Sequence, residues 1–162
     1  MENANNNESV EAENLMFFGL FQLHLDAKGR IALPAYIGKK FEPKQELVLT
    51  KTYNHHYPVI AVFPNIERHQ EGINFYDCMK DFSIDDRRNI WNANTMVFPM
   101  DLAKRITLRR HFKEFIPENK EITIFCQGLW CEFWKTDDYN EYKAYLDKKL
   151  EEEIQNQKRL TK

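Results

Sequence analysis

An internal duplication constrains the fold of this 162-residue chain more than any other feature. The segment Asp26-Ala-Lys-Gly-Arg30-Ile-Ala-Leu33 aligns with Asp101-Leu-Ala-Lys-Arg105-Ile-Thr-Leu108, so that Asp, Arg, Ile and Leu coincide. The apolar runs Leu47-Val48-Leu49 and Ile122-Thr123-Ile124 follow at the same offset of 75 residues. Because self-similarity at a fixed period marks repeated structural units, the sequence predicts two copies of about 65 to 70 residues rather than one irregular domain.

Both copies predict the same order of elements: a strand, a tight turn, a short strand, a short helix and two further strands. Alternating apolar residues indicate the strands, and Asp and Gly indicate the turns. In the first copy we expect strands at 17–25, 30–33, 46–50 and 59–63, with helices at 35–41 and 65–76. In the second copy we expect strands at 96–100, 105–108, 121–126 and 129–134, with a helix at 109–115.

These elements divide the chain into five segments. Residues 1–15, rich in Asn and Glu, predict a disordered leader, and Met16 is an alternative start to Met1. The two repeats occupy residues 16–76 and 95–135, joined by a linker helix within 77–94 whose start is indicated by Ser83. Apolar residues at three- and four-residue steps in 136–162 predict an amphipathic helix of about four to five turns and a tail.

The net charge of −2 hides an uneven distribution. Residues 1–15 carry −4 and residues 137–162 carry −1, which leaves +3 on residues 16–136. The acidic balance of the whole chain therefore does not exclude a nucleic-acid partner.

Nothing in the sequence points to catalysis or to a bound metal. Cys78, Cys126 and Cys131 lack CxxC spacing and fit a reducing cytosol. Cys126 and Cys131 with two histidines would make a zinc site, but no paired His-x-x-x-His follows them, so structural thiols are the favoured interpretation. Without a Gly-rich phosphate loop or a Ser/His/Asp set, we expect no enzyme activity, no cofactor and no metal.

Two Asp-x-x-x-Arg turns, each leading into a strand and a short helix, resemble the MraZ family. Three further segments are similar to that family: Met16-Phe-Phe-Gly19, Pro58-Val-Ile-Ala-Val-Phe-Pro64 and Cys131-Glu-Phe-Trp134. The likeness extends from Met16 to about Leu150. One departure is Lys104, which stands where the family's second motif has Gly.

The resemblance implies an α+β fold of two tandem AbrB/SpoVT-like swapped-hairpin half-barrels, which form a pseudo-twofold double-split β-barrel with flanking helices. It implies a transcriptional regulator that binds double-stranded DNA at promoter repeats of the bacterial division and cell-wall gene cluster. It further implies a homo-oligomer, a ring, located in the cytoplasm at the nucleoid and without a membrane partner. In the family, the two turns are the DNA-contacting surface.

The residues of the turns suit that role on chemical grounds. Arg30 and Arg105 each begin a strand, from which a guanidinium can bind phosphate or guanine bidentately, and Lys28 and Lys104 are mobile charges suited to phosphate. Asp26 and Asp101 would repel phosphate, so we expect them to cap turn amides or orient the arginines, and Gly29 to supply a positive φ. If Lys104 keeps that positive φ, its backbone conformation is less favourable than that of glycine by roughly 1 kcal/mol or more. Otherwise the turn has changed type.

Two alternatives remain open. For a single turn, an Asp–Arg pair that only stabilises the fold is the simpler interpretation, and the duplication argues against it. The other function class is an AbrB-fold antitoxin-like or scaffold protein that sequesters a partner through its C-terminal helix.

Overall fold

The computed structural model of the protein describes residues 15–116 and 121–161. The strands are β1 (Phe17–His24), β2 (Arg30–Ala32), β3 (Glu46–Asn54), β4 (Tyr57–Phe63), β5 (Thr95–Pro99), β6 (Arg105–Thr107), β7 (Glu121–Gly128) and β8 (Cys131–Lys135). The helices are α2 (Ala35–Gly38), α3 (Ile66–Gly72), the 3₁₀ turn η1 (Asp77–Met79), α4 (Ile84–Ala93) and α5 (Thr136–Leu160). The mixed α+β class that the sequence predicts is confirmed.

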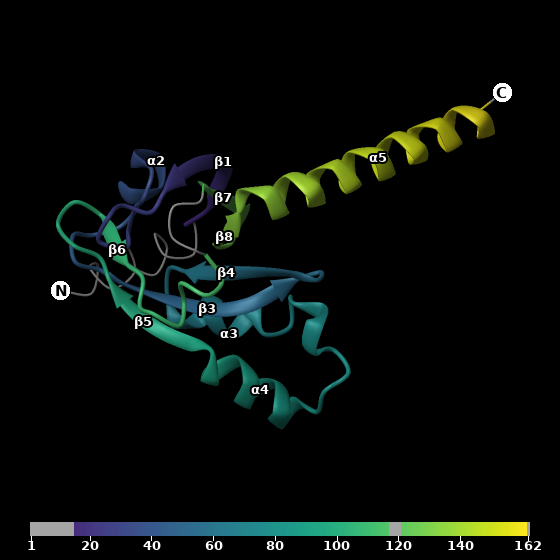
Figure 1. Ribbon diagram of the computed structural model, residues 1–162. Coiled ribbons are helices and arrows are strands. Elements are labelled where there is room, and N and C mark those ends of the chain that lie inside the picture. The colour runs from purple at the N-terminus through teal and green to yellow at the C-terminus, as the bar shows by residue number, and fades with distance from the viewer. Residues whose placement is uncertain (1–14, 117–120, 162) are drawn as a thin grey trace, which may run out of the picture.

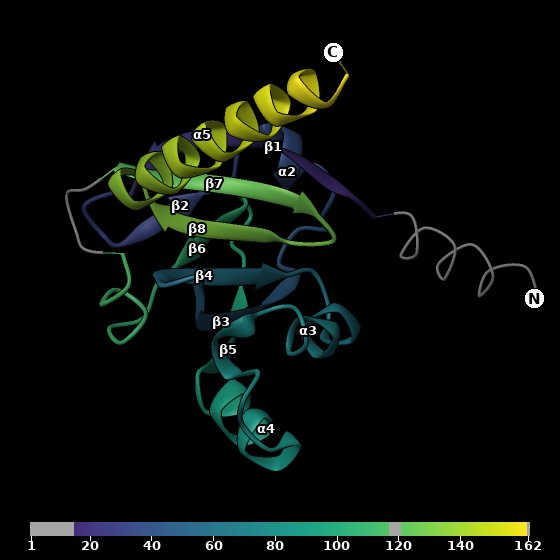
Figure 2. The ribbon, with the colours of Figure 1, turned by 90° about the vertical axis from the view of Figure 1, so that its right-hand side faces the viewer.

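The strands form one six-stranded antiparallel sheet in the order β1-β7-β8-β4-β3-β5 and a separate two-stranded ribbon, β2-β6. Figure 2 shows the large sheet with α5 above it and α4 below it. Strands β1, β7 and β8 on one side of the sheet correspond in order, from the edge to the centre, to β5, β3 and β4 on the other side. The sheet is therefore pseudo-symmetric about the β4–β8 pair.

Each half of the chain contributes its first strand to the other half. Leu23 of β1 pairs with Ile122 of β7, and Phe98 of β5 pairs with Leu47 of β3, which are the corresponding positions of the two sequence copies. In the centre, Val59 pairs with Trp134 and Val62 with Cys131. This exchange joins residues that are far apart in sequence, so the two halves share one sheet.

The central strands bury both of their faces. Alternate residues of β4 belong to two apolar clusters, with Ile60 and Val62 on one side and Val59 and Phe63 on the other. The first cluster lies between the sheet and the β2-β6 ribbon, and the second is aromatic and includes Trp91, Trp130 and Trp134. Because side chains alternate across a strand, one apolar run serves both cores.

The helices differ in extent from the sequence prediction. Ser83 caps α4 by accepting a hydrogen bond from the Asp86 amide, as the capping pattern predicts. α5 is 25 residues long, well beyond the predicted four to five turns. Its first turns pack against the body through Tyr139 and Tyr142, whose rings lie 5.5 Å from that of Trp134, and the remainder projects outward (Figure 1).

The predicted helix at 109–115 is wrong. That segment forms successive turns in which the amides of Phe112, Phe115 and Ile116 bond to carbonyls three residues back. Pro117 follows it in the sequence, and the residue before a proline is disfavoured in the α conformation. A helix is therefore disfavoured from continuing through Ile116, and Phe112 and Ile116 remain in the core.

Most of the predicted disordered leader, residues 1–15, lies outside the described residues. Leu15 is described, and it packs partly buried against the first apolar cluster.

Candidate nucleic-acid interface

The two Asp-x-x-x-Arg turns lie at either end of the β2-β6 ribbon and are tied to it by matching hydrogen bonds. Ile31 pairs with Ile106, and both side chains are fully buried. Beyond the ribbon, the Leu33 amide donates to the Lys104 carbonyl at 3.1 Å, and the Leu108 amide donates to the Gly29 carbonyl at 3.0 Å. Each turn is thus anchored to the strand of the other half.

The first turn is organised by the Asp26 carboxylate. Its Oδ1 accepts hydrogen bonds from the amides of Lys28 and Arg30, both at 2.9 Å, and its Oδ2 accepts one from Arg30 Nε at 2.6 Å. The hydrogen bond from the Arg30 amide is the largest cause that lowers the pKa of Asp26 below its ordinary value. Gly29 has a φ of 74°, a conformation that glycine adopts without strain.

The second turn has the same backbone geometry. Asp101 Oδ1 accepts from the amides of Ala103 and Arg105 at 2.9 Å, and Oδ2 accepts from Arg105 Nε at 2.7 Å. The pKa of Asp101 is lowered as well, first of all by the hydrogen bond from the Arg105 amide. Lys104 has a φ of 57°, so the turn keeps its type although Lys replaces Gly. A non-glycine residue in this conformation costs roughly 1–2 kcal/mol.

The ribbon presents both arginines on its outer face. Side chains alternate between the two faces of the ribbon. Ile31 and Ile106 point inward and are buried, whereas Arg30 and Arg105 lie on the opposite face and are partly exposed. Each arginine contacts its aspartate through Nε. A guanidinium has five N–H donors in a planar fork, so an Nε contact orients the edge formed by the two terminal nitrogens.

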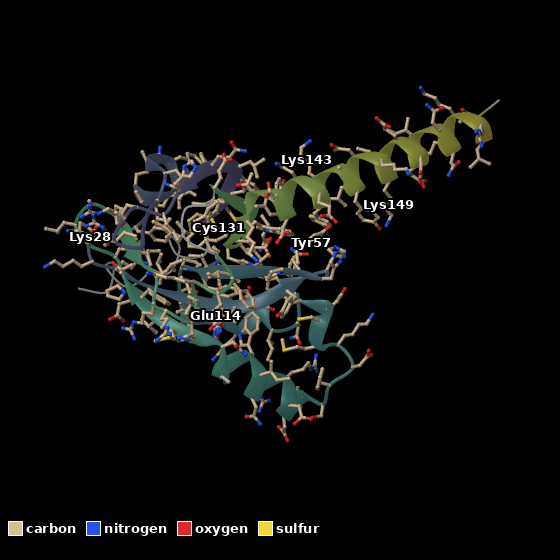
Figure 3. The ribbon with its side chains drawn as sticks, in the orientation of Figure 1. Lys28, Tyr57, Glu114, Cys131, Lys143 and Lys149 are labelled. Atoms are coloured by element: carbon tan, nitrogen blue, oxygen red, sulfur yellow. The ribbon has the colours of Figure 1, made fainter. Side chains whose placement is uncertain are left out.

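The two predicted lysines are placed differently. Lys28 lies at the end of the molecule opposite to α5, where it is exposed (Figure 3). Lys104 is half-buried, and its amine donates a hydrogen bond to the backbone carbonyl of Phe41 in the first half. Its Cβ and Cγ pack against Gly38.

The sequence pattern missed Lys113. Its Nζ lies 2.6 Å from the position that a Cβ on Gly29 would take, so its side chain crosses the first turn. Gly38 and Lys113 are equivalent positions of the two copies, and so are Gly29 and Lys104. Lys113 of the second copy faces Gly29 of the first, and Lys104 of the second copy faces Gly38 of the first. Aligning residues 34–38 with 109–113 shows that Gly38 and Lys113 are equivalent, but the contact of each lysine with a glycine of the other half is seen only in the structure.

Within residues 15–116 and 121–161, no group of three or more His, Cys, Asp or Glu side chains is placed to hold a metal ion. Cys126 and Cys131 lie opposite one another in neighbouring strands of the β7–β8 hairpin, and both are buried free thiols. Among the helices of the same residues, none has the length and apolar character to cross a membrane.

A pseudo-symmetric β ribbon that presents two aspartate-braced arginines defines a candidate anion-binding surface. No family model matches the chain. It is similar to proteins called "Transcriptional regulator MraZ" in three bacteria. The protein of Mycoplasma mycoides is 27% identical, over 83% of this chain and 98% of its own. The protein of Mycoplasma capricolum is 28% identical, over 81% and 96%. The protein of Carboxydothermus hydrogenoformans is 27% identical, over 78% and 86%. The resemblance to the MraZ family is thus confirmed.

Proposed function

We propose that this protein is a transcriptional regulator that binds double-stranded DNA through its two Asp-x-x-x-Arg turns. The observation that carries the proposal is the pair of arginines on the outer face of the β2-β6 ribbon, each held through Nε by an aspartate. The major groove of B-DNA admits a two-stranded ribbon, and an arginine fork binds the O6 and N7 atoms of guanine or a phosphate. The names of the relatives support the regulatory role.

The finer features of the proposal come from the family. They are two AbrB/SpoVT-like repeats at 16–76 and 95–135 in a swapped-hairpin double barrel, promoter repeats of the division and cell-wall gene cluster as targets, and a place at the nucleoid in the cytoplasm. The exchange of β1 and β5 between the halves supports the swapped arrangement.

Affinity in this proposal requires more than one copy of the chain. Each turn offers few cations, and one neutralised phosphate contributes only about −0.9 to the salt slope on duplex DNA. Copies held side by side in a homo-oligomeric ring and facing spaced DNA repeats gain about 10²–10⁴ in avidity. Light scattering tests the assembly, and a DNA that carries one repeat should bind far more weakly than a DNA that carries several.

The central experiment titrates the protein with the DNA upstream of its own gene at two salt concentrations. We expect Arg30→Ala and Arg105→Ala each to weaken specific binding by about 1–3 kcal/mol and to reduce the preference over unrelated DNA. Arg159→Ala, at the far end of α5, is the matched control and should bind as the wild type does. Binding that survives the loss of both turn arginines would exclude this surface.

A second candidate function rests on α5. Its outer turns carry exposed apolar side chains, among them Leu146, Leu150 and Ile154, which step along the helix every four residues. Such a stripe favours capture of a partner helix, as in the antitoxin-like or scaffold alternative. Leu150→Glu discriminates: normal promoter binding with loss of a co-purifying protein supports capture, whereas loss of the homo-oligomer places the stripe between copies of this chain.

A further inference from the structure

The two turns share a backbone conformation but differ at their tips. Between the aspartate and the arginine, the first turn carries Ala27, Lys28 and Gly29, whereas the second carries Leu102, Ala103 and Lys104. The exposed tip is therefore cationic in the first turn and apolar in the second.

Leu102 is held outward on a braced turn. Its side chain is 72% exposed, and among the large apolar side chains of the described residues only Leu160, in the last turn of α5, is more exposed. The Asp101 carboxylate binds the amides on the C-terminal side of Leu102, those of Ala103 and Arg105. The leucine thus projects from a fixed position, immediately beside the group that orients Arg105.

The cation of the second turn is directed away from its tip. The Lys104 amine is bonded to the Phe41 carbonyl, and its stem lies on Gly38. In the first turn, by contrast, Lys28 lies at the tip itself and is exposed. The first turn therefore combines its arginine with an exposed lysine, and the second combines its arginine with one projecting leucine.

This pairing matches a specific feature of the major groove. Thymine is the one DNA base that presents an apolar group there, its C5-methyl, and small apolar side chains contact it while arginine reads guanine. We propose that Leu102 is a specificity-determining residue that contacts a thymine methyl beside the base bound by Arg105. The inference rests on the proposed DNA-binding function.

The test removes only the methyl group. The upstream DNA is prepared with deoxyuridine in place of thymidine, and binding of the wild type and of Leu102→Ala to both DNAs is measured. Burial of one methyl group predicts about a fourfold weaker binding of the wild type to the uracil DNA for each methyl contacted. Leu102→Ala should bind the thymine DNA more weakly and should lose most of that sensitivity to uracil.

Two controls separate this effect from others. Uracil also changes the stacking of the DNA, but that change acts equally on the wild type and on Leu102→Ala. The difference between the two proteins in their loss of affinity on uracil DNA therefore measures the contact between Leu102 and the methyl group. Leu160→Ala, which removes an exposed leucine far from the turns, should keep the full sensitivity of the wild type.

The outcomes distinguish this inference from the function beneath it. Salt-dependent binding of the wild type that is equal on both DNAs, or full sensitivity retained by Leu102→Ala, overturns the role of Leu102 and leaves the proposed function intact. If Leu102→Ala forms an oligomer of different mass but keeps the wild-type sensitivity to uracil, the leucine lies in a contact between copies of the chain. That result also overturns the proposed contact with thymine. Absence of wild-type binding to either DNA overturns the proposed function, and this inference with it.

Discussion

Ile31 of β2 and Ile106 of β6 are paired directly opposite one another, and both side chains are fully buried beneath the ribbon that carries the two turns. They are equivalent residues of the two sequence copies, so the pseudo-twofold axis passes between them. The spacing of Arg30 and Arg105 is therefore fixed by a core contact rather than by the turns alone.

Shortening either isoleucine should loosen that contact. We expect Ile31→Val and Ile106→Val each to lower the free energy of unfolding by about 0.5–1.5 kcal/mol, since a buried methyl is lost in a close-packed site. Urea denaturation measures the change. Ile84→Val is the matched control because Ile84 is 57% exposed, and it should change stability by less than about 0.5 kcal/mol. Equal effects at all three positions would contradict the central role of the pair.

The carboxylates that brace the turns predict an acid-sensitive contribution to stability. The pKa values of Asp26 and Asp101 are lowered in the folded state, mainly by backbone hydrogen bonds, so the unfolded chain binds protons first as the pH falls. Their contribution is complete above the ordinary aspartate pKa of 3.8 and is lost as the pH falls through the lowered values.

Asp26→Asn and Asp101→Asn should therefore lower the melting temperature at pH 7 and reduce its decline below pH 4. Thermal unfolding followed between pH 2 and pH 7 measures both effects. The same substitution at exposed Asp81 serves as the control. A wild-type decline retained in both turn variants would show that other groups cause it.

The turns show how much of the site a sequence can predict. The period of 75 residues located both turns, and Asp and Arg at a fixed spacing predicted the capping bonds, because these contacts are local. The hydrogen bond from Lys104 to Phe41 and the crossing of Gly29 by Lys113 join the two halves, and no local pattern encodes them. The fold divides in the same way: the strands followed from alternation, whereas the exchange of β1 and β5 and the projection of α5 depend on tertiary packing.

A buried carboxylate in the aromatic core supports a further prediction. Glu132 accepts hydrogen bonds from Asn54 Nδ2, from Trp134 Nε1 at 3.1 Å and from the Tyr76 hydroxyl at 2.7 Å. Trp130 Nε1 donates to the same hydroxyl at 3.0 Å, which fixes its proton toward Glu132. Three side chains thus direct donors at one carboxylate, while burial raises the pKa of Glu132.

Glu132→Gln keeps the shape of the side chain but turns an N–H group toward these donors. We expect it to reduce the free energy of unfolding by about 1–3 kcal/mol, because buried donors lose their acceptor. Glu152→Gln on the exposed part of α5 is the control, and chemical denaturation compares the two. Equal stability of both variants would mean that the network contributes nothing net.

His69 predicts a pH dependence near neutrality. It is 2% exposed, its ring stacks on Trp91 with centroids 5.3 Å apart, and its Nε2 lies 3.0 Å from the Thr95 hydroxyl oxygen. That hydroxyl donates to the Trp91 carbonyl, so it accepts from His69 Nε2–H. Nδ1 then carries no proton in the neutral ring, and among the described residues it has no hydrogen-bond partner.

Protonation of Nδ1 would therefore bury a charge without an acceptor, and burial lowers the pKa of His69 below the ordinary value of 6.5. The unfolded chain binds this proton first, so stability should be constant well above pH 6.5 and fall as the pH decreases through it. Glu132, whose pKa is raised, acts in the opposite direction at lower pH, and for this reason the comparison is made between variants. His69→Gln should flatten the dependence of the unfolding free energy between pH 7.5 and pH 5.5, whereas the same change at exposed His111 should leave the wild-type slope. An unchanged slope in His69→Gln would show that the buried imidazole is not the group that titrates.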